Sequence, residues 1–253
     1  MTAWSGSFAL RIVYDVLHRR NIDFGKRERK PLVAEPLIRG GKYLLSGLYR
    51  SLEGDPHPRF CWREVKAGSR LTLSVHFLRE DVARAFLEGL VEEQTLEEPA
   101  CNLAVQSISY RYSELPDPEP VGEEVKVFKV KFLSPTAFMF YGRDVLYPSP
   151  ARLVLSALKS YGELAGVDTK EASEGVAKTA EVVYSPRCER VYVDIGEGRR
   201  VPAFLGEAHV ALHGSRDIPL LVAALKSAEL LGVGISRAVG FGRISVEEGE
   251  HGR

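Results

Sequence analysis

The stretch Ser113–Gly122, with the sequence SELPDPEPVG, decides how the rest of the chain is divided. It holds three prolines and three acidic residues between two segments in which apolar and polar residues alternate. Proline restricts the backbone to extended conformations and removes a hydrogen-bond donor, so such a stretch is typical of a linker. We therefore predict an N-terminal unit over residues 1–114, a linker over 115–122 and a C-terminal unit over 123–253.

The N-terminal unit switches between the strand period of two residues and the helix period of about 3.6 residues. In chain order the pattern predicts a strand Phe8–Leu17, a helix Gly41–Leu52, strands Arg59–Val65 and Leu71–Phe77, a helix Asp81–Val91 and a strand Asn102–Tyr112. This βαββαβ order is that of a ferredoxin-like unit, in which two helices cover one face of an antiparallel sheet.

The C-terminal unit repeats the same order of elements. The pattern predicts a strand Val125–Phe132, a helix Pro150–Leu164 capped by Ser149, two or three strands within Val182–Leu212, a helix Ile218–Leu231 and a strand Gly242–Val246. The predicted fold class is therefore α+β, with two tandem ferredoxin-like (βαββαβ) units and antiparallel sheets. A single α+β domain with irregular β insertions is the alternative.

The composition limits the classes of protein to which the chain can belong. Lysine and arginine number 34, as do aspartate and glutamate, so the chain cannot bind nucleic acid through a bulk positive charge. The three cysteines are too far apart for a metal-binding knuckle, and their odd number favours a reducing compartment. Charges interrupt every long apolar stretch, so we expect a cytoplasmic protein with no membrane span, metal or cofactor. The two Asn and two Gln are few, as in many thermophile proteins.

The zero net charge conceals an uneven distribution. Residues 1–70 hold 14 basic and 7 acidic residues, whereas residues 71–120 hold 3 basic and 10 acidic residues. The basic residues between the first predicted strand and the first predicted helix are Arg19, Arg20, Lys26, Arg27, Arg29, Lys30, Arg39 and Lys42. This cluster has two interpretations, a solvated loop or a surface that binds phosphate groups beside a helix start.

The segment 232–243, with the sequence GVGISRAVGFGR, carries four glycines, Gly232, Gly234, Gly240 and Gly242, and two arginines, Arg237 and Arg243. Such a backbone can approach another backbone closely and expose consecutive N–H groups. It is not a dinucleotide-binding fingerprint, because Arg237 stands at the sixth position and a predicted helix precedes the glycines. No Gly-Lys-Ser/Thr follows, which excludes a Walker-type loop. A tight helix-to-strand connection is the alternative to a binding loop.

The chain resembles a known family in several segments. The pattern G-x-G, five residues and G-x-G-R before the last strand of a second ferredoxin-like unit is similar to that of CRISPR-associated endoribonucleases that cut repeat RNA, in the RAMP superfamily. The segments Lys126–Phe138, Lys42–Leu52 and Ser74–Leu90 resemble the start of the second unit, the first helix, and the third strand with the second helix. The resemblance covers most of the chain. Guide-complex backbone subunits share the glycine-rich segment.

The resemblance implies a metal-independent endoribonuclease that converts precursor RNA to guide RNA. In this family the 2′-OH attacks the adjacent phosphate, leaving a 2′,3′-cyclic phosphate and a 5′-OH. His57 falls where the family commonly has its catalytic histidine, and Tyr49 matches the position of a catalytic tyrosine; an exposed turn histidine and a core tyrosine are the alternatives. We place Lys42 and Arg59 at the scissile phosphate. The expected RNA-binding residues are Arg19, Arg20, Arg39, Gly232, Gly234, Arg237, Gly240, Gly242 and Arg243.

Two other functions remain open from the sequence. A non-catalytic RNA-binding RAMP subunit of a CRISPR effector complex would keep the basic cluster and the glycine-rich segment without needing His57. A tandem ferredoxin-like protein that binds a small ligand or partner protein is the third. The expected partner is CRISPR repeat RNA; other CRISPR complex subunits and a second copy of the chain are further candidates.

Overall fold

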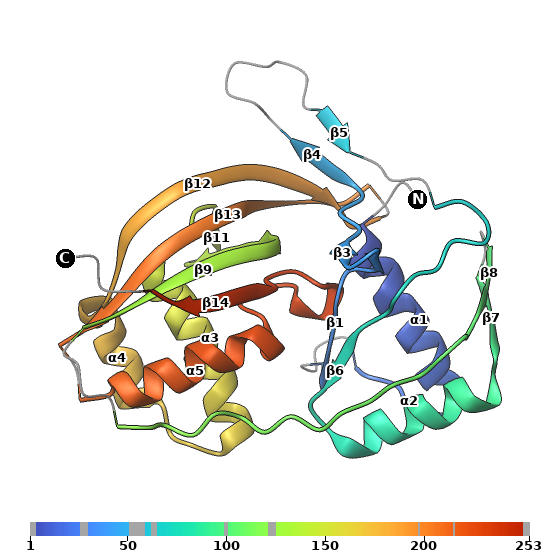
Figure 1. The fold of residues 1–253 in the computed structure, drawn as a ribbon, viewed down its shortest axis with the longest axis horizontal. Coiled ribbons are helices and arrows are strands. Elements are labelled where there is room, and N and C mark those ends of the chain that lie inside the picture. The colour runs from blue at the N-terminus through green and yellow to red at the C-terminus, as the bar shows by residue number, and fades with distance from the viewer. Residues whose placement is uncertain are drawn as a thin grey trace.

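The computed structural model describes residues 4–25, 30–50, 59–61, 65–98, 101–120, 125–196, 198–214 and 216–249. The chain forms two α/β halves that lie side by side, joined by a long extended segment along one edge of the molecule (Figure 1). Within these described ranges, no helix has the length and apolar character needed to cross a membrane.

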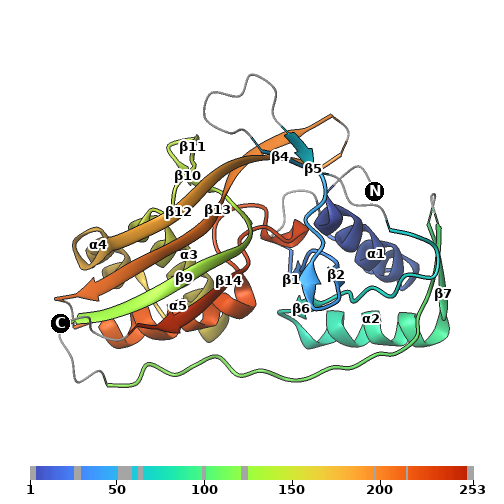
Figure 2. The ribbon, with the colours of Figure 1, turned by 45° about the horizontal axis from the view of Figure 1, so that its top comes forward.

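The C-terminal half has the topology of a ferredoxin-like unit. Its elements are β9 (Val125–Thr136), β10 (Phe138–Phe140), β11 (Arg143–Val145), α3 (Pro150–Ala165), α4 (Lys170–Thr179), β12 (Ala180–Asp194), β13 (Arg200–His213), α5 (Ile218–Leu231) and β14 (Ile244–Glu248). The strands β14, β9, β13 and β12 lie in that order, and every pair is antiparallel. Helices α3 and α5 pack together under this sheet (Figure 2), and Phe128, Leu158, Phe204 and Leu225 are buried between the layers.

Local sequence signals explain why α3 forms where it does. The Ser149 side chain accepts a hydrogen bond from the backbone N–H of Arg152, Pro150 occupies the first turn, and Gly166 ends the helix in a left-handed conformation. Each of these residues is favoured at its position, because it satisfies or avoids an unpaired backbone group. The predicted Ser149 cap is confirmed, and so are the predicted bounds of α5.

The N-terminal half contains α1 (Ser5–Arg19), β1 (Leu32–Ala34), β2 (Ile38–Arg39), β3 (Lys42–Tyr43), β4 (Leu48–Arg50), β5 (Arg59–Cys61), β6 (Val75–Phe77), α2 (Glu80–Glu92), β7 (Thr95–Glu98) and β8 (Cys101–Ala104). Strand β1 pairs antiparallel with β6, and β2–β3 and β7–β8 form separate hairpins. Ile12, Val16, Leu32 and Phe86 bury apolar surface where α1 and α2 pack against this small sheet.

The strand predicted over Phe8–Leu17 is wrong, because this segment lies in α1. Its buried residues are Ala9, Ile12, Val13, Val16 and Leu17, at intervals of three and four that place them on one helix face. The described part of the N-terminal half therefore begins with a helix. Elements α1, β1, β6 and α2 correspond to the central αββα part of the predicted βαββαβ order.

The helix predicted over Gly41–Leu52 is also wrong, because the described part of this segment forms β3 and β4. Gly41 and Gly47 have φ values of 74° and 77°, which a right-handed helix does not permit. Leu48 is buried and Tyr49 is half-buried, which is the alternation of a strand.

Strand β4 joins the sheet of the C-terminal half, so that the complete order is β14-β9-β13-β12-β4-β5. Tyr49 lies opposite Tyr192 of β12 on one side and opposite Phe60 of β5 on the other. The N-terminal half thus lends two strands to the sheet of the other half.

The extended segment between the halves contains the predicted linker. Residues 105–120 form neither helix nor strand, so the strand predicted over Asn102–Tyr112 ends at Ala104. The side chain of Leu115 packs against the C-terminal core, and the Tyr161 hydroxyl donates a hydrogen bond of 3.0 Å to the carbonyl oxygen of Pro116. The segment is therefore held against the C-terminal half, and the domain limits at 114 and 123 stay a prediction. The α+β fold class with antiparallel sheets is confirmed.

Candidate functional site

The glycine-rich segment 232–243 connects α5 to β14 through a short 3-10 turn, η1 (Arg237–Val239). Its four glycines all have positive φ, between 67° and 79°. A Cβ atom on Gly242 would lie 1.8 Å from the carbonyl oxygen of Val233, and one on Gly234 would lie 2.3 Å from that of Ala137. Both positions require glycine, because a side chain would collide with backbone. This geometry supports the interpretation as a tight helix-to-strand connection.

The same segment reaches the N-terminal half, as Figure 1 shows where the trace between α5 and β14 passes β1 and the start of α1. A Cβ atom on Gly240 would lie 2.8 Å from the ring of Pro36, just beyond β1. At the first turn of α1, the Trp4 indole donates a 2.5 Å hydrogen bond to the carbonyl oxygen of Val239. The glycine-rich segment is therefore part of the contact between the halves.

A buried charged cluster lies at this contact and is formed by Glu35, Tyr43, His76 and Arg243. The Glu35 Oε1 atom is 2.6 Å from Nη2 of Arg243 and 2.7 Å from Nε2 of His76. The Tyr43 hydroxyl donates to Oε2 of Glu35 at 3.0 Å. The Arg243 and Glu35 side chains are each 7% exposed, so the ion pair is almost fully removed from solvent.

The surroundings of Glu35 keep it ionised. Burial alone would raise its pKa, but the hydrogen bond from His76 and the positive charge of Arg243 outweigh burial and lower the pKa to about 2. Burial and then the negative charge of Glu35 raise the pKa of Tyr43, so its hydroxyl keeps the proton that it donates. The cluster therefore holds one fixed negative charge against the arginine of the glycine-rich segment.

The sequence does not predict this cluster, and we expected Arg243 to bind RNA. That assignment conflicts with the structure, because the Arg243 guanidinium is buried on Glu35 and also donates to the carbonyl oxygen of Leu230 at 2.7 Å. One signal could have pointed to Glu35: it is a single acid in the apolar run Leu32–Leu37, where a buried charge needs a partner. The sequence alone does not indicate which basic residue pairs with Glu35.

The other predicted RNA-binding arginines lie at separate places. Arg19 and Arg20, at the end of α1, form ion pairs with Glu93, Glu88 and Glu92 at the end of α2. These pairs involve two of the five basic residues of this cluster that the structure describes. Arg237 donates hydrogen bonds to Ser160 Oγ of α3 and to the carbonyl oxygen of Leu231.

The β2–β3 hairpin presents two predicted cations together. Arg39 lies opposite Lys42 in the antiparallel register, and both side chains are exposed. Gly40 and Gly41 form the turn between them with positive φ, as a two-residue hairpin requires. The structure therefore places a pair of exposed positive charges at the tip of a hairpin.

The predicted catalytic residues are only partly described. His57 and the side chain of Arg59 lie outside the part of the chain that the structure describes. The Tyr49 ring lies 4.2 Å from the guanidinium of Arg200, which donates a 3.3 Å hydrogen bond to the Tyr49 hydroxyl. Tyr49 and Arg59 lie on the paired strands β4 and β5, whereas Lys42 lies on the separate β2–β3 hairpin.

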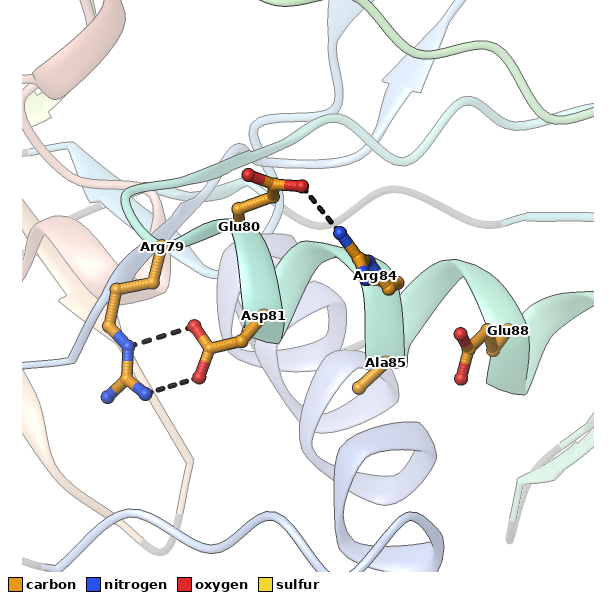
Figure 3. A pocket seen from close by; sticks show the side chains of 6 residues that line it. All are labelled: Arg79, Glu80, Asp81, Arg84, Ala85 and Glu88. Carbon is orange, nitrogen blue, oxygen red and sulfur yellow. Dashed lines mark hydrogen bonds and ion pairs between the residues drawn. The ribbon is translucent and has the colours of Figure 1, made fainter.

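A depression of about 500 Å³ lies over the first turns of α2, and its two arginines are paired with two of the acidic residues that line it (Figure 3). The Arg79 Nε atom is 3.0 Å from Oδ1 of Asp81, and Nη2 of Arg84 is 2.6 Å from Oε1 of Glu80. Because these arginines are already paired with carboxylates, we do not propose this surface as a ligand site. In the part of the chain that the structure describes, no group of three or more His, Cys, Asp or Glu side chains could hold a metal ion.

Comparison with known sequences gives a match over the C-terminal half. The family model described as CRISPR-associated endoribonuclease Cas6 matches residues 130–244, from within β9 to the start of β14. Cas6 of Mycobacterium tuberculosis is 33% identical over 129 residues, which are 49% of this chain and 40% of that protein. Cas6 of Streptococcus thermophilus is 26% identical over 129 residues, 50% of this chain and 53% of that protein. The matched residues thus span about half the length of these relatives.

Comparison with solved structures extends the likeness in fold to nearly the whole chain. A Cas6 product complex has a TM-score of 0.70 at 20% identity, covering 98% of this chain and 95% of that chain. Thermus thermophilus Cas6 has a TM-score of 0.63 at 20% identity, covering 96% and 91%. The predicted resemblance is confirmed: the C-terminal half of the chain is similar in sequence to CRISPR-associated endoribonuclease Cas6 proteins, and nearly the whole chain is similar to Cas6 structures in fold.

Proposed function

We propose that the chain is an endoribonuclease that binds CRISPR repeat RNA and cleaves it into guide RNA. The observation that carries this proposal is the glycine-rich segment at the contact between the halves, which lies inside the region that the Cas6 family model matches. The named relatives are endoribonucleases, and a structure of the same fold is a product complex.

The proposed reaction is a metal-independent transesterification. A base removes the proton of the 2′-OH, the 2′ oxygen attacks the adjacent phosphorus, and the bond from phosphorus to the 5′ oxygen breaks. An acid protonates the leaving 5′ oxygen, so the products are a 2′,3′-cyclic phosphate and a 5′-OH. Cations beside the phosphate stabilise the charge that develops in the transition state.

We assign His57 as the acid or base and Tyr49, Lys42 and Arg59 as groups around the scissile phosphate. Support comes from the pairing of β4 with β5, which brings both ends of the segment that contains His57 to one place beside Tyr49. The guanidinium of Arg200 on the Tyr49 ring adds a positive charge to the same sheet face. A phosphate bound there would meet donors from both halves of the protein.

One observation favours a second function, a non-catalytic RNA-binding subunit of a CRISPR complex. The matched region, residues 130–244, includes the glycine-rich segment but none of the residues 42–59 that carry the proposed chemistry. Such a subunit would bind the repeat through the same contact between the halves without cutting it.

One assay separates the two functions. The purified protein is incubated with an end-labelled CRISPR repeat RNA in EDTA, and binding and cleavage are followed on native and denaturing gels. Cutting at a single phosphate supports the endoribonuclease. Tight binding without cutting would reject the endoribonuclease in favour of the binding subunit, and absence of binding at low salt would reject both.

A further inference from the structure

The β10–β11 hairpin projects from the C-terminal half between β9 and α3, and Figure 2 shows it beside β12 at the edge of the molecule. Its base is anchored: the Phe138 side chain is buried with its ring centroid 5.8 Å from that of Phe204, and Val145 packs against the same core. The two strands pair from Phe138–Val145 to Phe140–Arg143, so the residues at the tip are held at fixed positions.

The tip carries large apolar side chains that face solvent. Tyr141 is 91% exposed and Phe140 is 46% exposed, and their ring centroids lie 4.6 Å apart at an interplanar angle of 69°. Met139 and, beyond the hairpin, Tyr147 are also exposed. Single exposed apolar residues are ordinary, but a group of this kind on one projecting element marks a binding surface.

The backbone at the tip strengthens this interpretation. Tyr141 has a φ of 46° and Gly142 a φ of 73°, so both central residues of the turn are left-handed. Such turns strongly favour Asn-Gly or Gly-Gly, and a left-handed tyrosine costs about 1 kcal/mol. The turn therefore exposes the Tyr141 ring to solvent at a position where asparagine would fit the backbone better. This cost indicates that the ring itself has a role.

Two arginines lie with these rings. The Arg152 guanidinium, from the first turn of α3, lies 4.1 Å from the centroid of the Phe140 ring. Arg143 is exposed on β11 directly opposite Phe140, and the acid of the hairpin, Asp144, lies opposite Met139. Aromatic faces beside arginine are the combination that binds single-stranded nucleic acid, because every base can stack and every phosphate can pair with a guanidinium.

We infer that the β10–β11 hairpin is a platform for unpaired nucleotides of the bound RNA. Bases stack on Tyr141 and Phe140, while Arg143 and Arg152 contact the adjoining phosphates. This inference rests on the proposed function and adds to it a second point of contact, away from the glycine-rich segment, that selects unpaired RNA without reading its sequence. A protein partner would use the apolar rings but would not need the two guanidinium groups.

The test compares two RNAs on matched variants. Fluorescence anisotropy measures the dissociation constants of a labelled single strand carrying the CRISPR repeat and of a blunt duplex made by annealing its complement. Tyr141→Asn removes the ring and suits the left-handed turn, so it should keep or raise stability while weakening single-strand binding about tenfold. Phe140→Ala should act in the same direction. The matched control is Tyr112→Ala, which removes a tyrosine that is 81% exposed outside this hairpin.

Each outcome bears on a different proposal. A loss confined to the single strand, with Tyr112→Ala like wild type, supports the platform. Unchanged single-strand binding by Tyr141→Asn and Phe140→Ala overturns the platform while leaving cleavage untouched, and equal losses on both RNAs overturn its selectivity for unpaired nucleotides. A lower self-association of these variants in sedimentation, with RNA binding intact, overturns the platform in favour of a protein contact. If wild type binds neither RNA, the proposed function falls and the platform with it.

Discussion

At the residue scale, the Glu35–Arg243 ion pair holds the end of the glycine-rich segment against the N-terminal half. The pair joins the residue after β1 in the N-terminal half to the residue before β14, and both side chains are buried. A buried ion pair adds little stability compared with apolar residues of the same shape, but the loss of one partner leaves an uncompensated charge. We therefore expect the pair to specify the arrangement of the two halves more than it stabilises them.

Glu35→Gln should lower the free energy of unfolding by about 3 kcal/mol, because the Arg243 charge would stay buried without a counter-charge. Urea denaturation followed by circular dichroism measures the change. The double variant Glu35→Leu with Arg243→Met should recover much of the loss, since it removes both charges. A cost below about 1 kcal/mol for Glu35→Gln would show that the pair is open in solution.

The same pair gives the protein a pH dependence with a definite sign. The pKa of Glu35 lies near 2 in the folded protein against an ordinary value of 4.5, so its contribution is present above pH 4.5 and is lost as the pH falls toward 2. The stability difference between wild type and Glu35→Gln should shrink across that interval, where His76 and Arg243 would face a neutral carboxyl. Unfolding measured at several pH values tests this, and a constant difference would contradict it.

His57 is the residue on which the proposed chemistry depends most. His57→Ala should lower the single-turnover cleavage rate by about 10² to 10⁴-fold with little change in RNA affinity, because proton transfer would lose its acid or base. His18→Ala, at the exposed end of α1, is the control. Cleavage by His57→Ala at the wild-type rate would remove His57 from the mechanism.

The sequence indicated residue types better than residue partners. The four glycines followed from a local motif that lies inside the region matched by the family model, whereas His57 and Tyr49 lie outside that region and stay predictions. The engagement of Arg243 with Glu35 could not be predicted, because the two lie far apart in the chain and only the packing of the halves brings them together. The burial of Phe241 against Trp4 could not be predicted for the same reason.

At the element scale, the glycine-rich segment is a close-packed connection whose glycines are sterically required. Gly242→Ala should destabilise the protein by several times the roughly 1 kcal/mol that a left-handed alanine costs alone, because its Cβ would lie 1.8 Å from the Val233 oxygen. Gly166→Ala, also left-handed but with open space around it, is the matched control for thermal unfolding. Equal losses in the two variants would mean that the segment can move away.

Element prediction succeeded where one period and the end signals agreed. Helix α3 has its serine cap, proline and terminal glycine, and burial in β9 alternates from Val127 to Ser134. It failed over α1, where a run rich in Val, Ile and Phe suggested a strand although the buried positions follow helical spacing. It failed over β3 and β4 because the leucines have helical spacing, whereas Gly41 and Gly47 adopt positive φ values that a helix does not permit.

At the scale of the whole molecule, connections between the two halves include the extended segment, the glycine-rich segment and β4, which pairs with β12. Part of the balance between positive and negative charge is local: Arg19 and Arg20 at the end of α1 form ion pairs with glutamates at the end of α2. Exposed cations elsewhere, such as Arg39 and Lys42 of the β2–β3 hairpin, can attract phosphate groups.

The double variant Arg39→Gln with Lys42→Gln should weaken RNA binding and reduce the slope of log affinity against log salt by about one for each cation removed. The control, Arg79→Gln with Arg84→Gln, removes two arginines that form ion pairs on α2. Dissociation constants at several salt concentrations give both slopes. A slope unchanged in the hairpin variant would place the phosphates elsewhere.

The measurement that tests the central claim most directly is the mass of the RNA fragments made by the purified wild-type protein from a CRISPR repeat RNA in EDTA. The proposed reaction predicts one cut, with a 2′,3′-cyclic phosphate on the upstream fragment and a 5′-OH on the downstream fragment. Uncut RNA bound to the protein, or fragments with a 3′-OH and a 5′-phosphate, would contradict it.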